Sequence, residues 1–153
     1  MKSSRYREKE LRVATLLGTV LLAVSAPAFA EPTDRWWSGW GMGVSEYGWS
    51  GSDGSNVYIT CDSDGALGLN VAIRGIDPKP NTDVIFNLNG QEVRFWTKAD
   101  GEIEMQSRVS MNNLYFLFDE LRQGSTMFLR FDGLAKEFSL AGSAKGLGEG
   151  LCE

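Results

Sequence analysis

The chain has 153 residues, with 15 basic and 20 acidic side chains and no histidine. Without histidine, this chain contains no Ser-His-Asp or Cys-His catalytic site and no H-E-x-x-H zinc site. Its net charge of −5 disfavours nucleic acid and anionic membranes as partners, because both present negative phosphate groups.

The first 30 residues have the three parts of a secretory signal peptide. A basic opening is followed by an apolar stretch from Val13 to Val24, and Ala28-Phe29-Ala30 places small residues at both positions of a cleavage site. The apolar stretch is short for a membrane span, which favours cleavage over a retained signal anchor. We therefore predict a signal peptide at residues 1–30 and a periplasmic or secreted domain at residues 31–153, with no membrane span after cleavage.

Cleavage would make the protein more acidic. The signal peptide carries 5 basic and 2 acidic residues, so 10 basic and 18 acidic residues remain, a net charge of −8. A domain of that charge attracts basic surfaces and repels nucleic acid. If charge selects the partner, we expect a basic one.

The two cysteines, Cys61 and Cys152, are predicted to form a disulfide. An even pair in an exported chain is most simply bonded, and the redox alternative lacks the C-x-x-C spacing. The bond would close a loop of about 90 residues, for which the chain-entropy estimate is roughly 4–5 kcal/mol. It would bring the end of the chain back to an early strand.

The segment from Glu31 to Gly54 is rich in tryptophan and glycine. Glycines at 39, 41 and 43 alternate with larger residues, which suggests a strand through positions 39–44 with side chains on one face. Tryptophan in such a segment is often core, yet exposed aromatic residues also anchor partner chains and stack on sugars. The candidate surface for a partner or ligand consists of Trp36, Trp37, Trp40, Tyr47 and Trp49.

Two alternating stretches follow and predict neighbouring strands. Positions 57, 59 and 61 are apolar with polar or aromatic residues between them, so Cys61 is expected to face the core. After the turn "DSDG", Leu67, Leu69, Val71 and Ile73 alternate in the same way.

A hairpin is predicted in "DVIFNLNGQEVRFW". Asn89-Gly90 is the preferred pair for a two-residue type I′ turn. That turn sets Leu88 opposite Gln91, and it places the apolar residues of both strands on one face, namely Val84, Phe86, Leu88, Val93 and Phe95.

The rest of the chain predicts further strands and two helices. A strand is expected through Ile103, Met105, Ser107 and Val109, then a helix capped by Asn112 or Asn113 and ended by Gly124. Strands follow through Met127–Phe131 and in "EFSL", before a short helix in "GSAKGLGEGLC". The fold class is mainly β: an antiparallel sandwich or partly open barrel, with one medium helix and one short C-terminal helix.

Acidic pairs are the remaining source of catalytic chemistry. A glycosidase needs two carboxyl groups held across a cleft, and turns rich in aspartate also offer oxygen to calcium, but no twelve-residue calcium-loop pattern is present. Aspartate is common in turns for backbone reasons alone, so we predict neither an enzyme nor a cofactor or metal site. The pairs are Asp62 with Asp64, Asp100 with Glu102, and Asp119 with Glu120.

The C-terminal residues resemble a pattern in small exported bacterial proteins. The stretches "LFDELRQGSTMFLRF" and "KEFSLAGSAKGLGEGLC" are similar to the invasion-associated locus B family and, more loosely, to type VI secretion accessory proteins. Gly146-Leu147 stands where that pattern has Ala-Leu. The resemblance covers Leu117 to Cys152 together with Cys61, and it implies a periplasmic β-rich protein without established catalysis.

Three functions are compatible with these features. The first is a periplasmic binding or accessory protein that acts through contacts with another envelope protein. The second is an inhibitor or immunity protein against a basic toxic or lytic enzyme. The third is a carbohydrate-binding module that uses the tryptophan-rich segment to hold a glycan.

Overall fold

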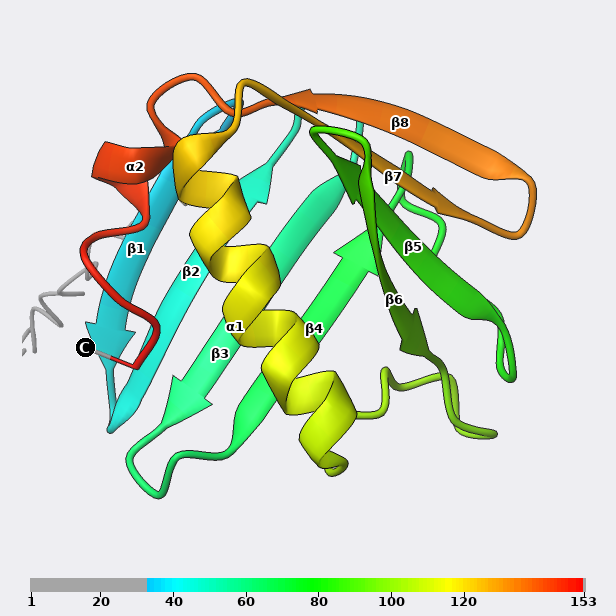
Figure 1. The fold of residues 1–153 in the computed structure, drawn as a ribbon, viewed down its shortest axis with the longest axis horizontal. Coiled ribbons are helices and arrows are strands. Elements are labelled where there is room, and N and C mark those ends of the chain that lie inside the picture. Colours follow the sequence, from blue (N-terminus) through cyan, green and yellow to red (C-terminus); the bar gives the residue numbers. More distant parts are fainter. Residues whose placement is uncertain (1–32, 153) are drawn as a thin grey trace, which may run out of the picture.

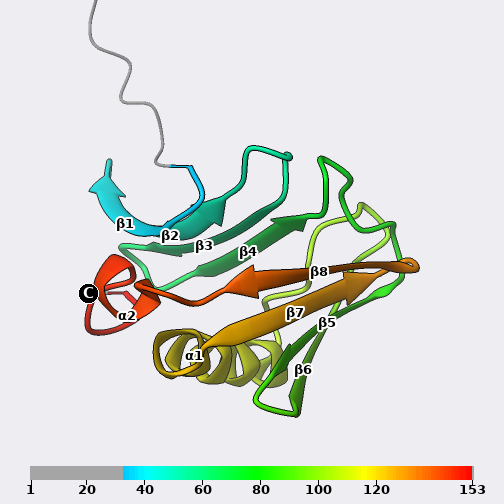
Figure 2. The same cartoon turned by 90° about the horizontal axis from the view of Figure 1, so that it is seen from above.

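The computed structural model describes residues 33–152, and the predicted signal peptide lies outside them. The described residues form two four-stranded antiparallel sheets and two helices (Figure 1). Seen from above, the sheet β1-β2-β3-β4 is one layer, and α1 and the sheet β6-β5-β7-β8 both lie on the same side of it (Figure 2). The predicted fold class is confirmed. The elements are β1 (Trp36–Gly41), β2 (Val44–Ser50), β3 (Asn56–Asp62), β4 (Leu67–Ala72), β5 (Asp83–Leu88), β6 (Gln91–Trp96), α1 (Arg108–Gln123), β7 (Thr126–Phe131), β8 (Leu134–Ser139) and α2 (Ser143–Gly146).

The alternation in β3 and β4 places one face of the first sheet in the core. Val57, Ile59 and Cys61 are buried, and they pair with Val71, Leu69 and Leu67 of β4. Because paired residues project to the same side of a sheet, both strands bury the same face. The predicted strands and the inward direction of Cys61 are confirmed.

The Asn89-Gly90 hairpin has the predicted register. Leu88 pairs with Gln91, Phe86 with Val93 and Val84 with Phe95. Asn89 and Gly90 have φ angles of 52° and 82°, as a type I′ turn requires at both central positions. The turn and the apolar pattern therefore select the same pairing.

Helix α1 begins earlier than predicted, and the expected strand through Val109 is wrong. Only Ile103 keeps a β-bridge, with Thr97, while the helix starts at Arg108 and Val109 is exposed on it. Ser107 is the N-cap in place of Asn112 or Asn113, because its side chain accepts a hydrogen bond from the amide of Ser110. The alternation of residues 103–109 had suggested a strand, but the cap decides the local structure.

The Glu104 carboxylate holds this helix start together. It accepts hydrogen bonds from the Ser110 hydroxyl at 2.7 Å, from the Ser107 hydroxyl at 2.9 Å, and from the amides of Ser107 and Gln106. These donors, the Ser110 hydroxyl first, lower the pKa of Glu104 from 4.5 to about 2. The ionised side chain thereby satisfies backbone donors that the helix itself leaves free.

The buried stripe of α1 and the two aromatic contacts beside it join the layers. Leu114, Leu117, Phe118 and Leu121 are buried as predicted, and Gly124 ends the helix. Phe118 meets Tyr47 of β2 edge to face, with ring centroids 4.9 Å apart, and Phe138 of β8 meets Trp49 in the same way. No helix within residues 33–152 is long and apolar enough to cross a membrane.

Replacing Glu104 by Gln is expected to destabilise the protein in a pH-dependent way. A carboxyl group whose pKa is depressed on folding adds stability above its unfolded pKa of about 4.5, and that stability is lost as pH falls through 2. Glu104→Gln should therefore lower the free energy of unfolding at pH 7 by about 1–3 kcal/mol, and the difference should shrink toward pH 2. Denaturant unfolding across this pH range measures it.

Glu137→Gln is the matched control, because Glu137 is exposed on β8. It should change the free energy of unfolding by less than about 0.5 kcal/mol. If Glu104→Gln lowered the free energy of unfolding by the same amount at pH 7 and at pH 2, the role assigned to the ionised carboxylate would be contradicted.

Candidate functional site

The tryptophan-rich segment forms a hairpin of two strands. Strands β1 and β2 pair in antiparallel register, and Met42 and Gly43 form the turn with φ angles of 53° and 85°. The predicted single strand through positions 39–44 is therefore wrong, since the chain reverses in its middle. Positive φ at both turn positions explains why glycine is present at 43.

Three members of the predicted aromatic surface are buried. Trp36 is 4% exposed, Tyr47 3% and Trp49 9%. The register pairs Trp36 with Trp49 and places Tyr47 on the same face of the sheet, so these three aromatic side chains face the core. The Trp36 indole donates a hydrogen bond to the Ser139 carbonyl oxygen at 2.9 Å. Their assignment to a partner surface is corrected: they pack the first sheet against the second layer.

Trp37 lies on the opposite, outer face of the first sheet and is half-buried. Its ring extends across Gly48 toward Tyr58, and those two rings have centroids 6.1 Å apart. A side chain at Gly48 would meet the Trp37 ring at 3.1 Å and the Val57 carbonyl oxygen at 3.0 Å. The glycine thus provides the space in which this indole is laid against the sheet.

Trp40 is the one member of the predicted set with a largely exposed side chain, at 75%. It lies at the end of β1 beside a shallow hollow of about 330 Å³ that includes Ser45, Asp62 and both cysteines. Met42, in the adjoining turn, is also fully exposed. Of the predicted aromatic surface, only Trp40 at the end of the β1–β2 hairpin is therefore largely exposed.

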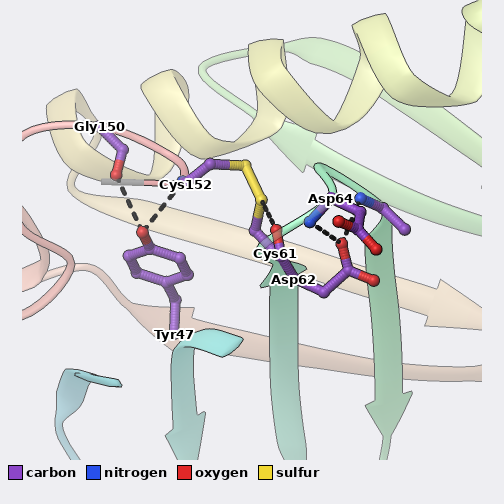
Figure 3. Close-up of a disulfide and its surroundings, with 7 residues drawn as sticks. Tyr47, Cys61, Asp62, Asp64, Gly150 and Cys152 are labelled. Carbon is purple, nitrogen blue, oxygen red and sulfur yellow. Dashed lines mark hydrogen bonds between the residues drawn. A yellow bond between two sulfur atoms is a disulfide. The ribbon is translucent and has the colours of Figure 1, made fainter. Parts of the chain in front are cut away.

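The disulfide closes the structure beside this hollow (Figure 3). Cys61 of β3 is bonded to Cys152, 91 residues away, with the two Cα atoms 5.3 Å apart. The Tyr47 hydroxyl accepts a hydrogen bond from the Cys152 amide at 3.0 Å and donates one to the Gly150 carbonyl oxygen at 3.2 Å (Figure 3). The predicted pairing is confirmed, and a buried tyrosine positions the tail that carries it.

The acidic pairs considered for catalysis are engaged in local structure. The Asp62 carboxylate accepts hydrogen bonds from the amides of Asp64 and Ala66, which shapes the β3–β4 turn (Figure 3). Asp100 and Glu102 both form ion pairs with Lys98, at 3.1 Å and 2.7 Å.

The remaining acidic pair lies on α1. Asp119 is exposed there, and Glu120 accepts a hydrogen bond from the Asn89 side chain. Residues 33–152 contain no group of three or more histidine, cysteine or acidic side chains placed to hold a metal ion.

An open groove of about 1050 Å³ runs along β4. Residues 66–71 form one side of it, and residues of the 98–106 segment form the other together with Met111 of α1. The end near the β4–β5 connection is lined by Asp77, Pro78 and Pro80. The groove therefore follows the edge strand of the first sheet.

The lining of the groove combines apolar residues with an acidic rim. Ile103, Met105 and Met111 provide apolar surface. The ionisable residues of the lining are Asp77, Asp100, Glu102 and Lys98. Since the carboxylates outnumber the lysine by two, and Lys98 is already paired with two of them, the groove favours a basic ligand.

Sequence reasoning missed this groove because its two sides are about thirty residues apart in the chain. One signal was present: β4, "LGLNVA", carries no charged residue and no proline, unlike most exposed edge strands. That signal becomes meaningful only once β4 is known to be an edge.

A family comparison identifies the lineage of this fold. The YfjT family model matches residues 34–147, which include every described strand and helix. The chain belongs to the YfjT family. No curated protein and no solved structure matches it. The resemblance of the C-terminal residues to the invasion-associated locus B family stays a prediction.

Loss of the disulfide is expected to destabilise this YfjT family member strongly. The Cys61→Ser, Cys152→Ser double variant should lower the free energy of unfolding by about 2–5 kcal/mol, because the unfolded chain loses a long closed loop. Tyr47→Phe, which keeps the ring and removes the hydroxyl, should cost about 1–2 kcal/mol. Denaturant unfolding compares the variants, and a double variant as stable as the wild type would contradict this account.

Proposed function

We propose that this protein is exported to the periplasm and acts there as a non-enzymatic binding protein that holds a segment of another envelope protein. The observation that carries the proposal is the open, acidic-rimmed groove along β4. Clefts with an apolar floor and a few charged groups are typical binding sites. A groove open along a sheet edge suits an elongated ligand better than a small enclosed one.

Export is supported by two independent features. Residues 1–30 have the basic, apolar and small-residue parts of a signal peptide. The Cys61–Cys152 disulfide is of a kind that persists in oxidising compartments such as the periplasm. The resemblance to exported bacterial proteins at the C-terminus agrees with both.

A binding role, in preference to catalysis, is supported by the state of the carboxyl groups. A general acid near neutral pH needs a raised carboxyl pKa. Hydrogen bonds and ion pairs instead lower the pKa of Asp100 in the groove, through the Glu102 amide first and then Lys98. Asp100 therefore remains charged at neutral pH, as attraction of a basic ligand requires.

The acidic groove also favours a second candidate function, inhibition of a basic toxic or lytic enzyme. Both functions place a basic segment in the same groove, and they differ in whether binding lowers the activity of the partner. The carbohydrate-binding alternative loses its main support, because Trp36, Tyr47 and Trp49 lie in the core.

Export is tested by the N-terminus of the protein recovered from its native cells. We expect mass spectrometry of the periplasmic fraction to find a chain that begins at Glu31 and carries a closed disulfide. A chain that keeps Met1 and remains in the cytoplasm, with both thiols open to alkylation, would contradict the proposal.

Binding in the groove is tested by site-specific crosslinking in living cells. A photoreactive amino acid at Asn70, which is exposed and lines the groove, should capture a partner protein, and the same group at Glu137 on β8 should not. Adding Asp77→Lys should abolish capture at position 70, because it reverses the charge at that position and removes the net negative charge of the rim. Equal capture at both positions, or capture that survives the charge reversal, would contradict binding in the groove.

The same material separates the two candidate functions. If the captured partner is an enzyme, a stoichiometric amount of this protein should reduce its turnover when the role is inhibition. Unchanged turnover would leave the accessory role.

A further inference from the structure

Strand β1 is an edge strand, and most of it is exposed to solvent. It pairs with β2 alone, and after the buried Trp36 and the half-buried Trp37 its remaining residues, 38–41, are all exposed. Helix α2 packs at the start of the strand, where Gly146 lies against the Trp36 carbonyl oxygen. Figure 2 shows the end of β1 curving away from α2. Another chain can therefore reach the edge at residues 38–41.

The β1–β2 turn determines which backbone groups of this edge are free. The residues on either side of a two-residue turn such as Met42-Gly43 form a pair that exchanges hydrogen bonds within the hairpin. Because bonded and non-bonded pairs alternate in an antiparallel ladder, Gly39 and Gly41 direct their backbone groups to β2. Ser38 and Trp40 direct theirs outward, and within residues 33–152 these groups have no backbone partner.

The sequence of this edge is self-complementary in size. Residues 37–41 read Trp-Ser-Gly-Trp-Gly, so when two copies of β1 run antiparallel with Gly39 opposite Gly39, each large residue faces a small one. Trp37 lies opposite Gly41 of the second copy, and Trp40 lies opposite Ser38. In this register the outward groups of Ser38 and Trp40 also face each other, as a hydrogen-bonded pair requires. A second copy of the chain therefore fits the edge in both side-chain size and hydrogen-bonding phase.

We propose that two copies of this protein pair through β1, antiparallel and about a two-fold axis at Gly39, to form one eight-stranded sheet. Strand β1 carries no charged residue, so no like charges meet along the paired edge. Each copy carries the same patch, and a closed two-fold dimer is the usual result of such pairing. The exposed Trp40 side chain would become partly buried against the second copy.

Charges at the two ends of β1 are complementary in this arrangement. Arg35 precedes the strand and is exposed. Antiparallel pairing brings it opposite Gly43 of the second copy, and Gly43 lies against Ser63 in the β3–β4 turn. That turn also contains Asp62 and the exposed Asp64. Each basic end thus approaches an acidic turn of the other copy, although the protein as a whole is acidic.

The pairing does not depend on the proposed function, but it would change how the β4 groove is used. In the joined sheet the two β4 strands lie at opposite ends, about 34 Å apart at about 4.8 Å per strand. The dimer would therefore present two grooves to a partner that carries two binding segments, and the second contact would form at a raised effective concentration.

Sedimentation of the protein, expressed from its complete coding sequence, tests the pairing. We expect a reversible dimer with a dissociation constant in the micromolar range, as for a short interface. Ser38→Pro should raise that constant at least about tenfold, because proline removes the outward amide and its ring obstructs the edge. Ser38→Ala keeps the amide and should leave the constant nearly unchanged. A wild-type chain that stays monomeric at about 1 mM would overturn the inference.

Hydrogen exchange of the wild-type protein locates the contact without any variant. As the protein concentration rises through the dimer range, exchange at the amides of Ser38 and Trp40 should slow by at least about tenfold, because they acquire carbonyl partners. The amides of Gly39 and Gly41, already bonded to β2, should not change. A dimer that leaves Ser38 and Trp40 unprotected would overturn pairing through β1.

Engineered cysteines measure the register. Opposed residues of a non-hydrogen-bonded pair have Cα atoms about 4.5 Å apart, within disulfide range. A side chain at Gly39 meets no atom closer than 3.8 Å, so Gly39→Cys should fold and, with oxidised glutathione as oxidant, form a covalent dimer that keeps the Cys61–Cys152 bond. Glu137→Cys, on the exposed edge strand β8, should not. More efficient crosslinking by Trp40→Cys than by Gly39→Cys would overturn the proposed register.

A charge exchange checks the contact between Arg35 and the acidic turn. Arg35→Asp and Asp64→Arg should each weaken the dimer at least about threefold, and the double variant should recover most of the loss. Losses that simply add in the double variant would contradict the proposed alignment of the strand ends.

A photoreactive amino acid at Ser38 identifies the occupant of the edge in cells. We expect an adduct of twice the mass of the chain, and adducts with other proteins alone would overturn pairing with a second copy. The proposed function is tested separately at Asn70. A monomeric chain that still captures a partner there would overturn the dimer and leave the proposed function, whereas a dimer without such capture would do the reverse.

Discussion

The disulfide between Cys61 and Cys152 anchors the C-terminal end of the chain to the first sheet. The helix α2, just before that end, packs against β1. The residues after β8 form only a four-residue helix and a glycine-rich tail, which bury little surface of their own. Leu147 is buried, and the Tyr47 hydroxyl holds Gly150 and Cys152. Together with the covalent bond, these contacts keep α2 against β1.

That anchoring covers the edge of the first sheet at Trp36 of β1. Among the four edge strands of the described sheets, β1 and β4 carry no charged residue, and β4 is the more buried of the two. Exposed apolar edges invite non-specific pairing. In β4 the 98–106 segment across the groove, with its acidic rim, limits what can reach the edge. The acidic rim favours a basic ligand in the groove.

The tryptophans serve packing more than recognition, and glycine explains how the sheet accommodates them. Trp36 and Trp49 pair across β1 and β2 and fill the space under β8, while Gly48 lets Trp37 lie flat on the outer face. The exposed tryptophans are Trp40, at the end of the hairpin, and Trp96 of β6. A cluster of aromatic residues in a sequence therefore indicates buried core packing more often than a binding surface.

The sequence by itself determined the features whose causes are local or countable. The hairpin at Asn89-Gly90 follows from a two-residue turn, the inward face of β3 from alternation, and the Cys61–Cys152 bond from the presence of only two cysteines. The start of α1 was missed because the hydrogen bonds of Ser107 and Glu104 outweigh an alternating pattern that suggested a strand. Only the tertiary structure decided which tryptophans are buried and which segments form the groove along β4, because burial and strand order depend on segments far apart in the chain.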